Sequence, residues 1–233
     1  MIYVGIDDTD TLESRGTGRL ARNIATTLSN NYKVFGVTRH QLFVHPDIPF
    51  TSHNSCAVIH IEAPETAANM ENIFLTTKKI MLNDFIEGSD PGLAVASDNQ
   101  IKAAAVAFGQ DAKTIIVTQE RARTLAGNYE IRFEGLGGTQ GGVIGAIAGV
   151  ALASLKNDGR FLLKGRNREL SGVRSVEEIV NAGIDQVLTL QGKTVTDRKV
   201  KIPKNATPSF VQGKAVLFVA ESDDNYMVAL KRP

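Results

Sequence analysis

The stretch "MIYVGIDDTDTLESRGTG" (residues 1–18) joins an apolar run to three closely spaced carboxylates. Residues 2–6 predict a buried strand, and Asp7, Asp8 and Asp10 follow at its end. Because side chains alternate along a strand, Asp8 and Asp10 are expected on one face, with Asp7 on the other or turned inward. Gathered carboxylates repel one another unless a cation joins them. We therefore predict that Asp8 and Asp10 hold Mg²⁺, with Asp7 assisting or acting as a base.

A structural interpretation of the same acids stays open beside this one. Asp7 and Asp8 would then cap a turn, and Asp10 would simply be exposed. A calcium-binding EF-hand loop is excluded, because Leu12 and Glu13 stand where that loop needs an acid and a glycine.

The residues after the acids predict a helix over 16–31, with an apolar stripe on one side. Its first residues are Gly16, Thr17 and Gly18, and the free N–H groups of a helix start favour a phosphate. Together with Thr9, these residues are candidates for nucleotide binding, and Thr17 for the group that holds or accepts a phosphoryl group. Phosphoryl transfer requires a metal site next to a phosphate site, and here the acids would hold the metal and the helix start would bind the phosphate.

The rest of the chain alternates between strand and helix patterns. Further strands are predicted at 33–40, 56–63, 92–98, 130–135, 185–192, 213–221 and 226–231, and helices at 65–86, 100–109, 143–156 and 175–183. The second of these helices is expected to stop at Gly109, and the last begins with a capping box formed by Ser175 and Glu178. This alternation predicts an α/β or α+β fold with about two layers in each lobe.

A glycine-rich turn, "EGLGGTQGG" (residues 134–142), precedes the apolar helix at 143–156. Dense glycine allows close approach of the backbone to a ligand, and a helix start follows, so Gly137, Gly138, Thr139 and Gly142 are candidate ligand-binding residues. The spacing matches neither a P-loop nor a dinucleotide fingerprint. The alternative is a tight turn before a closely packed helix.

Composition limits the class of protein. The 233 residues are 42% hydrophobic and 22% charged, as in an ordinary globular protein. No apolar run reaches the roughly 18 residues of a membrane span, no signal peptide is recognisable, and the single Cys56 excludes an internal disulfide or a cysteine zinc cluster. We expect a cytoplasmic protein without a membrane partner.

Charge is distributed unevenly along the chain. Residues 1–100 carry seven Lys/Arg against twelve Asp/Glu, whereas residues 156–204 carry eleven against six. The basic segment suits an anionic ligand such as a polyphosphate or RNA, but it lacks the interleaved aromatics that stack on single strands, so a solvated surface is the favoured interpretation for most of it. The four histidines fit no metal motif, and His53 is the one we expect to touch a substrate.

These motifs together resemble one family, the archaeal tRNA-isoleucine agmatinylcytidine synthetases, which join agmatine to a tRNA cytidine with ATP. The similarity lies in "GIDDTD" (5–10), in "TRHQLFVHPDIPFTSHNSCAV" (38–58) with Arg39 and the Ile48-Pro49 pair, in "DPGLAV" (90–95) and in "GGVIGAIAGVALA" (141–153). It covers most of residues 1–155. The alignment places Thr17 on the phosphorylated threonine of the family.

The resemblance implies a kinase-like lobe beginning in 1–60, a ferredoxin-like lobe in 61–150 and a strand-rich part in 151–233. It also implies ATP and Mg²⁺ as cofactors, a small-molecule or nucleoside acceptor, and Arg39 as a substrate-binding residue; RNA and a homodimer stay open as partners. The chain departs from the family at Thr51 and His53, where the family has Lys and Arg, and it has no room for the OB-fold and zinc ribbon of that family. The expected function is ATP- and Mg²⁺-dependent phosphoryl transfer, and the alternative is a non-catalytic nucleotide- or metabolite-binding protein.

Overall fold

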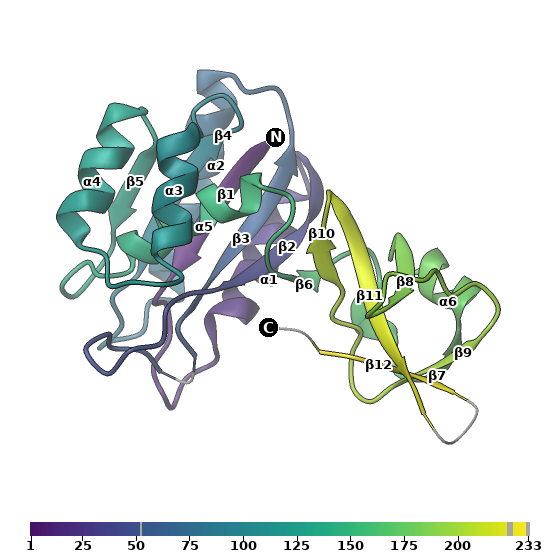
Figure 1. Ribbon diagram of the computed structural model, residues 1–233. Coiled ribbons are helices and arrows are strands. Elements are labelled where there is room, and N and C mark those ends of the chain that lie inside the picture. The colour runs from purple at the N-terminus through teal and green to yellow at the C-terminus, as the bar shows by residue number, and fades with distance from the viewer. Residues whose placement is uncertain (52, 223–225, 232–233) are drawn as a thin grey trace. The chain divides into compact units, whose positions relative to one another are not determined.

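The chain folds into two compact units, Met1–Leu155 and Lys156–Pro233 (Figure 1). The structure is a computed structural model and describes residues 1–51, 53–222 and 226–231. Mixed helices and strands confirm the predicted α+β class. None of the helices in these described ranges is long and apolar enough to cross a membrane.

The first unit is built on an antiparallel sheet with the strand order β5-β4-β1-β3-β2. The chain order β-α-β-β-α-β is that of a ferredoxin-like unit, and it runs from residue 2 to residue 97. Both expected ranges, 1–60 and 61–150, therefore contribute to this one sheet. The elements are β1 (Ile2–Asp7), α1 (Thr17–Leu28), β2 (Lys33–Gln41), β3 (Ser55–Glu62), α2 (Ala67–Asn83), β4 (Gly92–Ser97) and β5 (Arg132–Gly135).

One face of this sheet is covered by α5 (Val143–Ser154), which is apolar on nearly every side. A helix that is apolar all round is buried, and α5 lies between the sheet and two further helices, α3 (Ala103–Asp111) and α4 (Gln119–Asn128). Tyr3 and Val58 on the sheet share a core with α5. The stripe of α1 is buried as predicted, at Leu20, Ala21, Ile24, Ala25 and Leu28.

Two helices differ from the sequence prediction. The helix α3 does not stop at Gly109 but continues through it to Asp111. Gly109 is buried against α5, where an added Cβ would lie 3.2 Å from the carbonyl oxygen of Ala148, so this glycine permits close helix packing and does not act as a stop. The helix α4 has no counterpart in the prediction, because only Ala122 and Ala126 of it are buried and its apolar stripe is narrow.

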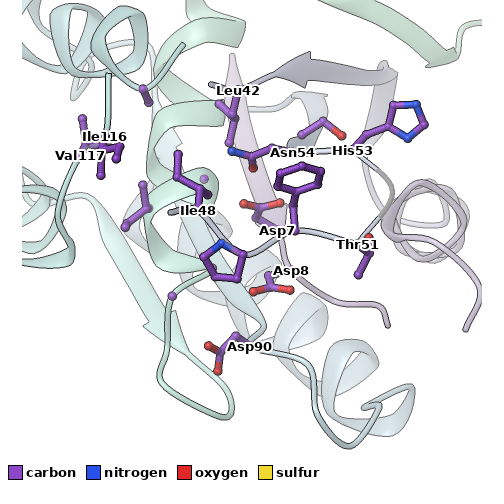
Figure 2. Close-up of a pocket in the computed structure, with 18 of the residues that line it drawn as sticks. Asp7, Asp8, Leu42, Ile48, Thr51, His53, Asn54, Asp90, Ile116 and Val117 are labelled. Atoms are coloured by element: carbon purple, nitrogen blue, oxygen red, sulfur yellow. The ribbon is translucent and has the colours of Figure 1, made fainter. Parts of the chain in front are cut away.

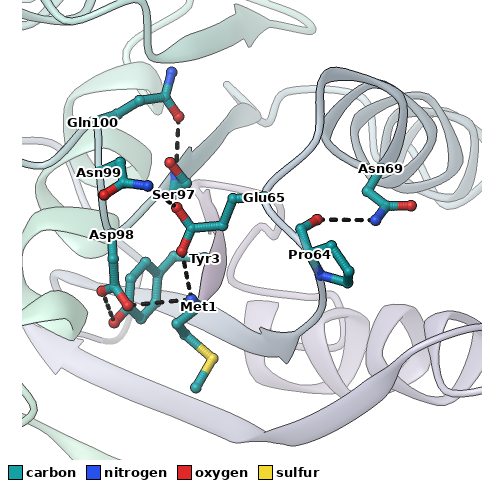
Figure 3. Close-up of polar contacts among 9 residues, drawn as sticks. All are labelled: Met1, Tyr3, Pro64, Glu65, Asn69, Ser97, Asp98, Asn99 and Gln100. Atoms are coloured by element: carbon teal, nitrogen blue, oxygen red, sulfur yellow. Dashed lines mark hydrogen bonds and ion pairs between the residues drawn. The ribbon is translucent and has the colours of Figure 1, made fainter.

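The start of β1 is fixed by polar contacts with the segments before α2 and after β4 (Figure 3). The α-ammonium of Met1 donates to Oε1 of Glu65 at 2.7 Å and lies 3.2 Å from Oδ2 of Asp98. The hydroxyl of Tyr3 donates to the other oxygen of Asp98 at 2.7 Å. These contacts hold the end of β1 opposite to its acidic tip.

The strands of the second unit are ordered β6-β10-β11-β12-β9-β7, with β8 parallel to β11. It has a separate apolar core that includes Ile179, Val200 and Leu217. The predicted capping box of Ser175 and Glu178 is confirmed at the start of α6. The elements are β6 (Arg160–Leu163), η1 (Asn167–Glu169), β7 (Gly172–Ser175), α6 (Val176–Asn181), β8 (Gln186–Thr189), β9 (Lys199–Ile202), β10 (Ser209–Val211), β11 (Lys214–Glu221) and β12 (Met227–Ala229).

Candidate functional site

Asp7 is the last residue of β1 and lies on the face that α5 covers. Its register partner is Gly92, and a Cβ placed on Gly145 of α5 would fall 1.8 Å from its carboxylate oxygen Oδ2. The absence of a side chain at Gly145 is therefore what lets the helix start approach the carboxyl group. Burial, followed by the charges of Asp8 and Asp10, raises the pKa of Asp7 to about 7.

Asp8 lies beyond the strand with φ of +52°, in the left-handed region that aspartate tolerates better than most residues. Burial and then the charges of Asp90 and Asp10 raise its pKa to about 6. Its carbonyl oxygen accepts the N–H of Asp90 at 3.1 Å. Strained backbone and carboxylates with raised pKa values are features that gather at functional sites.

Asp90 is the acid that sequence reasoning missed. Its carboxylate accepts the hydroxyl of Thr139 and the N–H of Gln140, the latter at 3.3 Å. Gly138, with φ of +51°, lies so close to this carboxylate that a Cβ there would fall 1.6 Å from Oδ1. Asp90 thus links the tip of β1 to the glycine-rich turn. The available signal was its place at the head of "DPGLAV" (90–95), one of the segments that carry the family resemblance.

Asp10 faces the start of α1, whereas Asp7 faces Gly145 of α5. The hydroxyl of Thr17 donates to Oδ1 of Asp10 at 2.7 Å, and that of Thr9 donates to Thr17 at 3.1 Å. The other oxygen of Asp10 is 3.5 Å from where a Cβ of Gly16 would stand. The carboxylate of Asp10 therefore takes the place beside the helix start where we expected a phosphate, and Gly18 follows inside the helix.

A cavity of about 290 Å³ joins these groups. Its residues come from the tip of β1, the start of α1, the β2–β3 loop, the α3–α4 connection, the segment before β4, the glycine-rich turn and the start of α5. Figure 2 labels Asp7, Asp8 and Asp90 among them. Five aspartates line it, and the described part of its lining includes no lysine or arginine. The lining residues are Asp7, Asp8, Asp10, Thr17, Leu42, Asp47, Ile48, Pro49, Phe50, Thr51, His53, Asn54, Ser55, Asp90, Ala112, Ile115, Ile116, Val117, Gln119, Thr139, Gly141, Gly142, Ile144 and Gly145.

The remaining predicted residues lie at different distances from this cavity. Gly142 and the exposed His53 line it, whereas Gly137 packs against the ring of Phe85. Arg39 lies next to the lining, where its Nε donates to Oγ of Ser55 at 2.8 Å.

The histidines do not gather at one place. His40 and His60 each bond to the buried hydroxyl of Thr38 at 2.7 Å, and His45 stacks on Phe43. Among the described residues that line the cavity, His53 is the one histidine.

The donor set fits a metal that arrives with a ligand. Across the described residues, no three His, Cys, Asp or Glu side chains stand close enough to form a complete metal site. Mg²⁺ is commonly held by one or two carboxylates together with substrate phosphates and water. Asp8 lies close enough to Asp90 and Asp10 for their charges to raise its pKa, so it is suited to hold such a metal together with a ligand.

The pKa of Asp7 predicts how stability depends on pH. Because the folded pKa, about 7, is above the ordinary value of 3.8, folding is penalised as the pH rises between these values. Asp7→Asn removes the penalty, so we expect the variant to be more stable by about 4 kcal/mol at pH 8 and about equal to the parent at pH 4. Urea unfolding with a chelator present measures this. Equal differences at both pH values would contradict the assignment.

Comparisons with known proteins give a likeness of fold. The sequence matches no protein-family model and no curated protein. Solved structures of a tRNA fluorescent labeling enzyme and of the TiaS–tRNA(Ile2)–ATP complex each match with a TM-score of 0.56 and 22% identity, over 64% of this chain. Apo TiaS, a tRNAIle2 agmatidine synthetase, matches with a TM-score of 0.54 and 21% identity. This chain spans only 35–36% of the length of those proteins. The comparison therefore establishes a TiaS-like fold for part of this chain.

Proposed function

We propose that this chain binds ATP together with Mg²⁺ in the acidic cavity and transfers its γ-phosphoryl group. The observation that carries the proposal is the charge of the lining, with five aspartates and no cationic side chain among the described lining residues. A polyphosphate alone would be repelled there, whereas a metal-bound polyphosphate would be attracted. The similar fold of a TiaS complex that contains ATP supports the choice of nucleotide.

Asp8 would hold the metal, with Asp10 and Asp90 beside it, and the start of α5 would face the phosphates. Mg²⁺ at that position supplies neutralisation of charge on the transferring group. Gly138 and Gly142 allow the backbone of the glycine-rich turn to stand close to this region. The contribution of the protein is then positioning and electrostatic stabilisation.

Thr17 is the proposed first acceptor of the phosphoryl group. Its Oγ1 forms a bond to the γ-phosphorus while the bond from that phosphorus to the β,γ-bridging oxygen breaks and ADP leaves. The hydroxyl proton passes to Oδ1 of Asp10, which already accepts it in a hydrogen bond of 2.7 Å. Asp7, with a pKa of about 7, is suited to proton exchange with a second acceptor.

The final acceptor is proposed only by class. The TiaS complexes contain tRNA and, in one case, agmatine, which makes a small amine and an RNA nucleoside the two classes to test first. The second candidate function, nucleotide binding without turnover, rests on the same cavity, because an acidic lining can hold a metal-bound polyphosphate without transferring its phosphoryl group.

A transfer assay separates these functions. Incubation with γ-labelled ATP and Mg²⁺ is expected to label Thr17, detected by peptide mass spectrometry. Asp10→Asn should slow labelling at saturating ATP by about 100-fold or more, because the proton acceptor is lost. Thr17→Ser keeps a hydroxyl and should be labelled, whereas Thr17→Val should not. ATP binding without any labelling, and without ADP formed with amine or RNA acceptors, would reject the enzyme and favour the binding protein.

A further inference from the structure

Two short apolar segments line the cavity. One is the α3–α4 connection, where Ile115 is 48% exposed and Ile116 is 47% exposed, with Val117 beside them. The other is the β2–β3 loop, which contributes Ile48 and a 43% exposed Phe50. Figure 2 shows Ile116 and Val117 apart from Asp7, Asp8 and Asp90. The cavity therefore has an acidic end at Asp7, Asp8 and Asp90, and the α3–α4 connection forms an apolar end apart from them.

The apolar end is held in place by backbone contacts on both sides. The N–H of Phe43 donates to the carbonyl oxygen of Ala112 at 2.9 Å, and the side-chain amide of Asn54 donates to the carbonyl oxygen of Phe43 at 2.6 Å. The N–H of Ile115 donates to the carbonyl oxygen of Asp111 at 2.8 Å. The half-exposed side chains thus stand on an ordered frame around a shared cavity, as in preformed ligand sites.

We infer that the apolar end holds the base of the nucleotide, a planar ring placed between Ile48 and Phe50 on one side and Ile115 and Ile116 on the other. This inference rests on the proposed function, because the acidic end fixes where a metal-bound polyphosphate would lie. A single molecule that is polyanionic at one end and a flat, largely apolar ring at the other matches both ends. A free amine would pair with the aspartates and would leave the apolar side chains without a ligand to cover them.

Affinities for ATP and for inorganic tripolyphosphate, both with Mg²⁺, separate base recognition from phosphate recognition. The Ile115→Ser, Ile116→Ser double variant should bind ATP about tenfold more weakly and tripolyphosphate unchanged. Leu75→Ser, Leu82→Ser is the matched control, because these α2 residues are 49% and 46% exposed and lie outside the cavity lining. The control should bind both ligands like the parent protein. Calorimetry gives the affinities, and thermal unfolding shows that each variant folds.

The outcomes distinguish a failure of this inference from a failure of the proposed function on which it rests. Suppose that the parent protein binds both ligands. If the Ile115→Ser, Ile116→Ser variant then loses affinity for neither ligand, or for both equally, the base site is wrong and the proposed function stands. If the Ile115→Ser, Ile116→Ser variant binds an RNA oligonucleotide more weakly and ATP unchanged, the apolar end holds a base of the acceptor and the inference is overturned. If the parent protein binds neither ATP nor tripolyphosphate, the proposed function itself fails.

Discussion

Asp8→Asn is expected to weaken Mg²⁺-dependent ATP binding by about 100-fold and to raise the melting temperature of the ligand-free protein. Binding falls because Asp8 is the proposed metal-holding carboxylate. Stability rises because burial and neighbouring charges lift its pKa to about 6, so its ionisation at neutral pH opposes folding. Asparagine tolerates the φ of +52° at this position, which removes backbone strain as a competing cause.

The matched control is Asp84→Asn, because Asp84 caps the end of α2 outside the cavity lining and its side chain is 44% exposed. It should change neither ATP affinity nor the effect of Mg²⁺. Calorimetric titration with and without Mg²⁺ gives the affinities, and a thermal scan gives the melting temperatures. Unchanged ATP affinity in Asp8→Asn would remove this residue from the metal site.

Gly92→Ala is expected to destabilise the first unit by about 3 kcal/mol or more, which lowers the melting temperature by about 6–12 °C. An added Cβ would stand 2.0 Å from the carbonyl carbon of Gly142, so the clash is with backbone at the start of α5 and no side chain can move to relieve it. The same reasoning applies to Gly5→Ala, where the Cβ would lie 2.2 Å from the carbonyl oxygen of Ala146.

Gly127→Ala is the control for this substitution. Gly127 is inside α4, and nothing lies within 4 Å of the place where its Cβ would stand. Alanine there should stabilise the protein by about 0.5–1 kcal/mol because it lowers the entropy of the unfolded chain. Chemical denaturation of both variants tests the pair. A Gly92→Ala variant as stable as its parent would mean that α5 does not pack on β4 as described.

Local signals in the sequence were sufficient for most elements. The apolar run of β1, the stripe of α1 and the capping box of α6 depend on neighbouring residues, and each is confirmed. The helix α3 was placed with the wrong end because the effect of Gly109 depends on what it packs against, which is α5. The helix α4 was missed because two alanines do not form a recognisable apolar stripe.

The candidate site was only partly predictable, for a reason of sheet topology. Ligand sites beyond the carboxyl ends of strands are typical of parallel sheets. Here β1 lies between two antiparallel neighbours, β3 and β4, so its carboxyl end meets the starts of both. Residues that precede those strands, Asn54 and Asp90, thereby join Asp7 and Asp8 around the cavity. No spacing within the sequence reveals that neighbourhood.

The contact between Asp7 and Gly145 has a consequence for synthesis of the protein. During synthesis the acidic motif leaves the ribosome before the helix against which Asp7 packs, because that helix starts at Val143, near the end of the first unit. Contacts this distant along the chain form late, after the entropy of closing a long loop has been overcome. A nucleotide bound as proposed would need both parts, so it would stabilise only finished units and would leave incomplete chains on the ribosome unliganded.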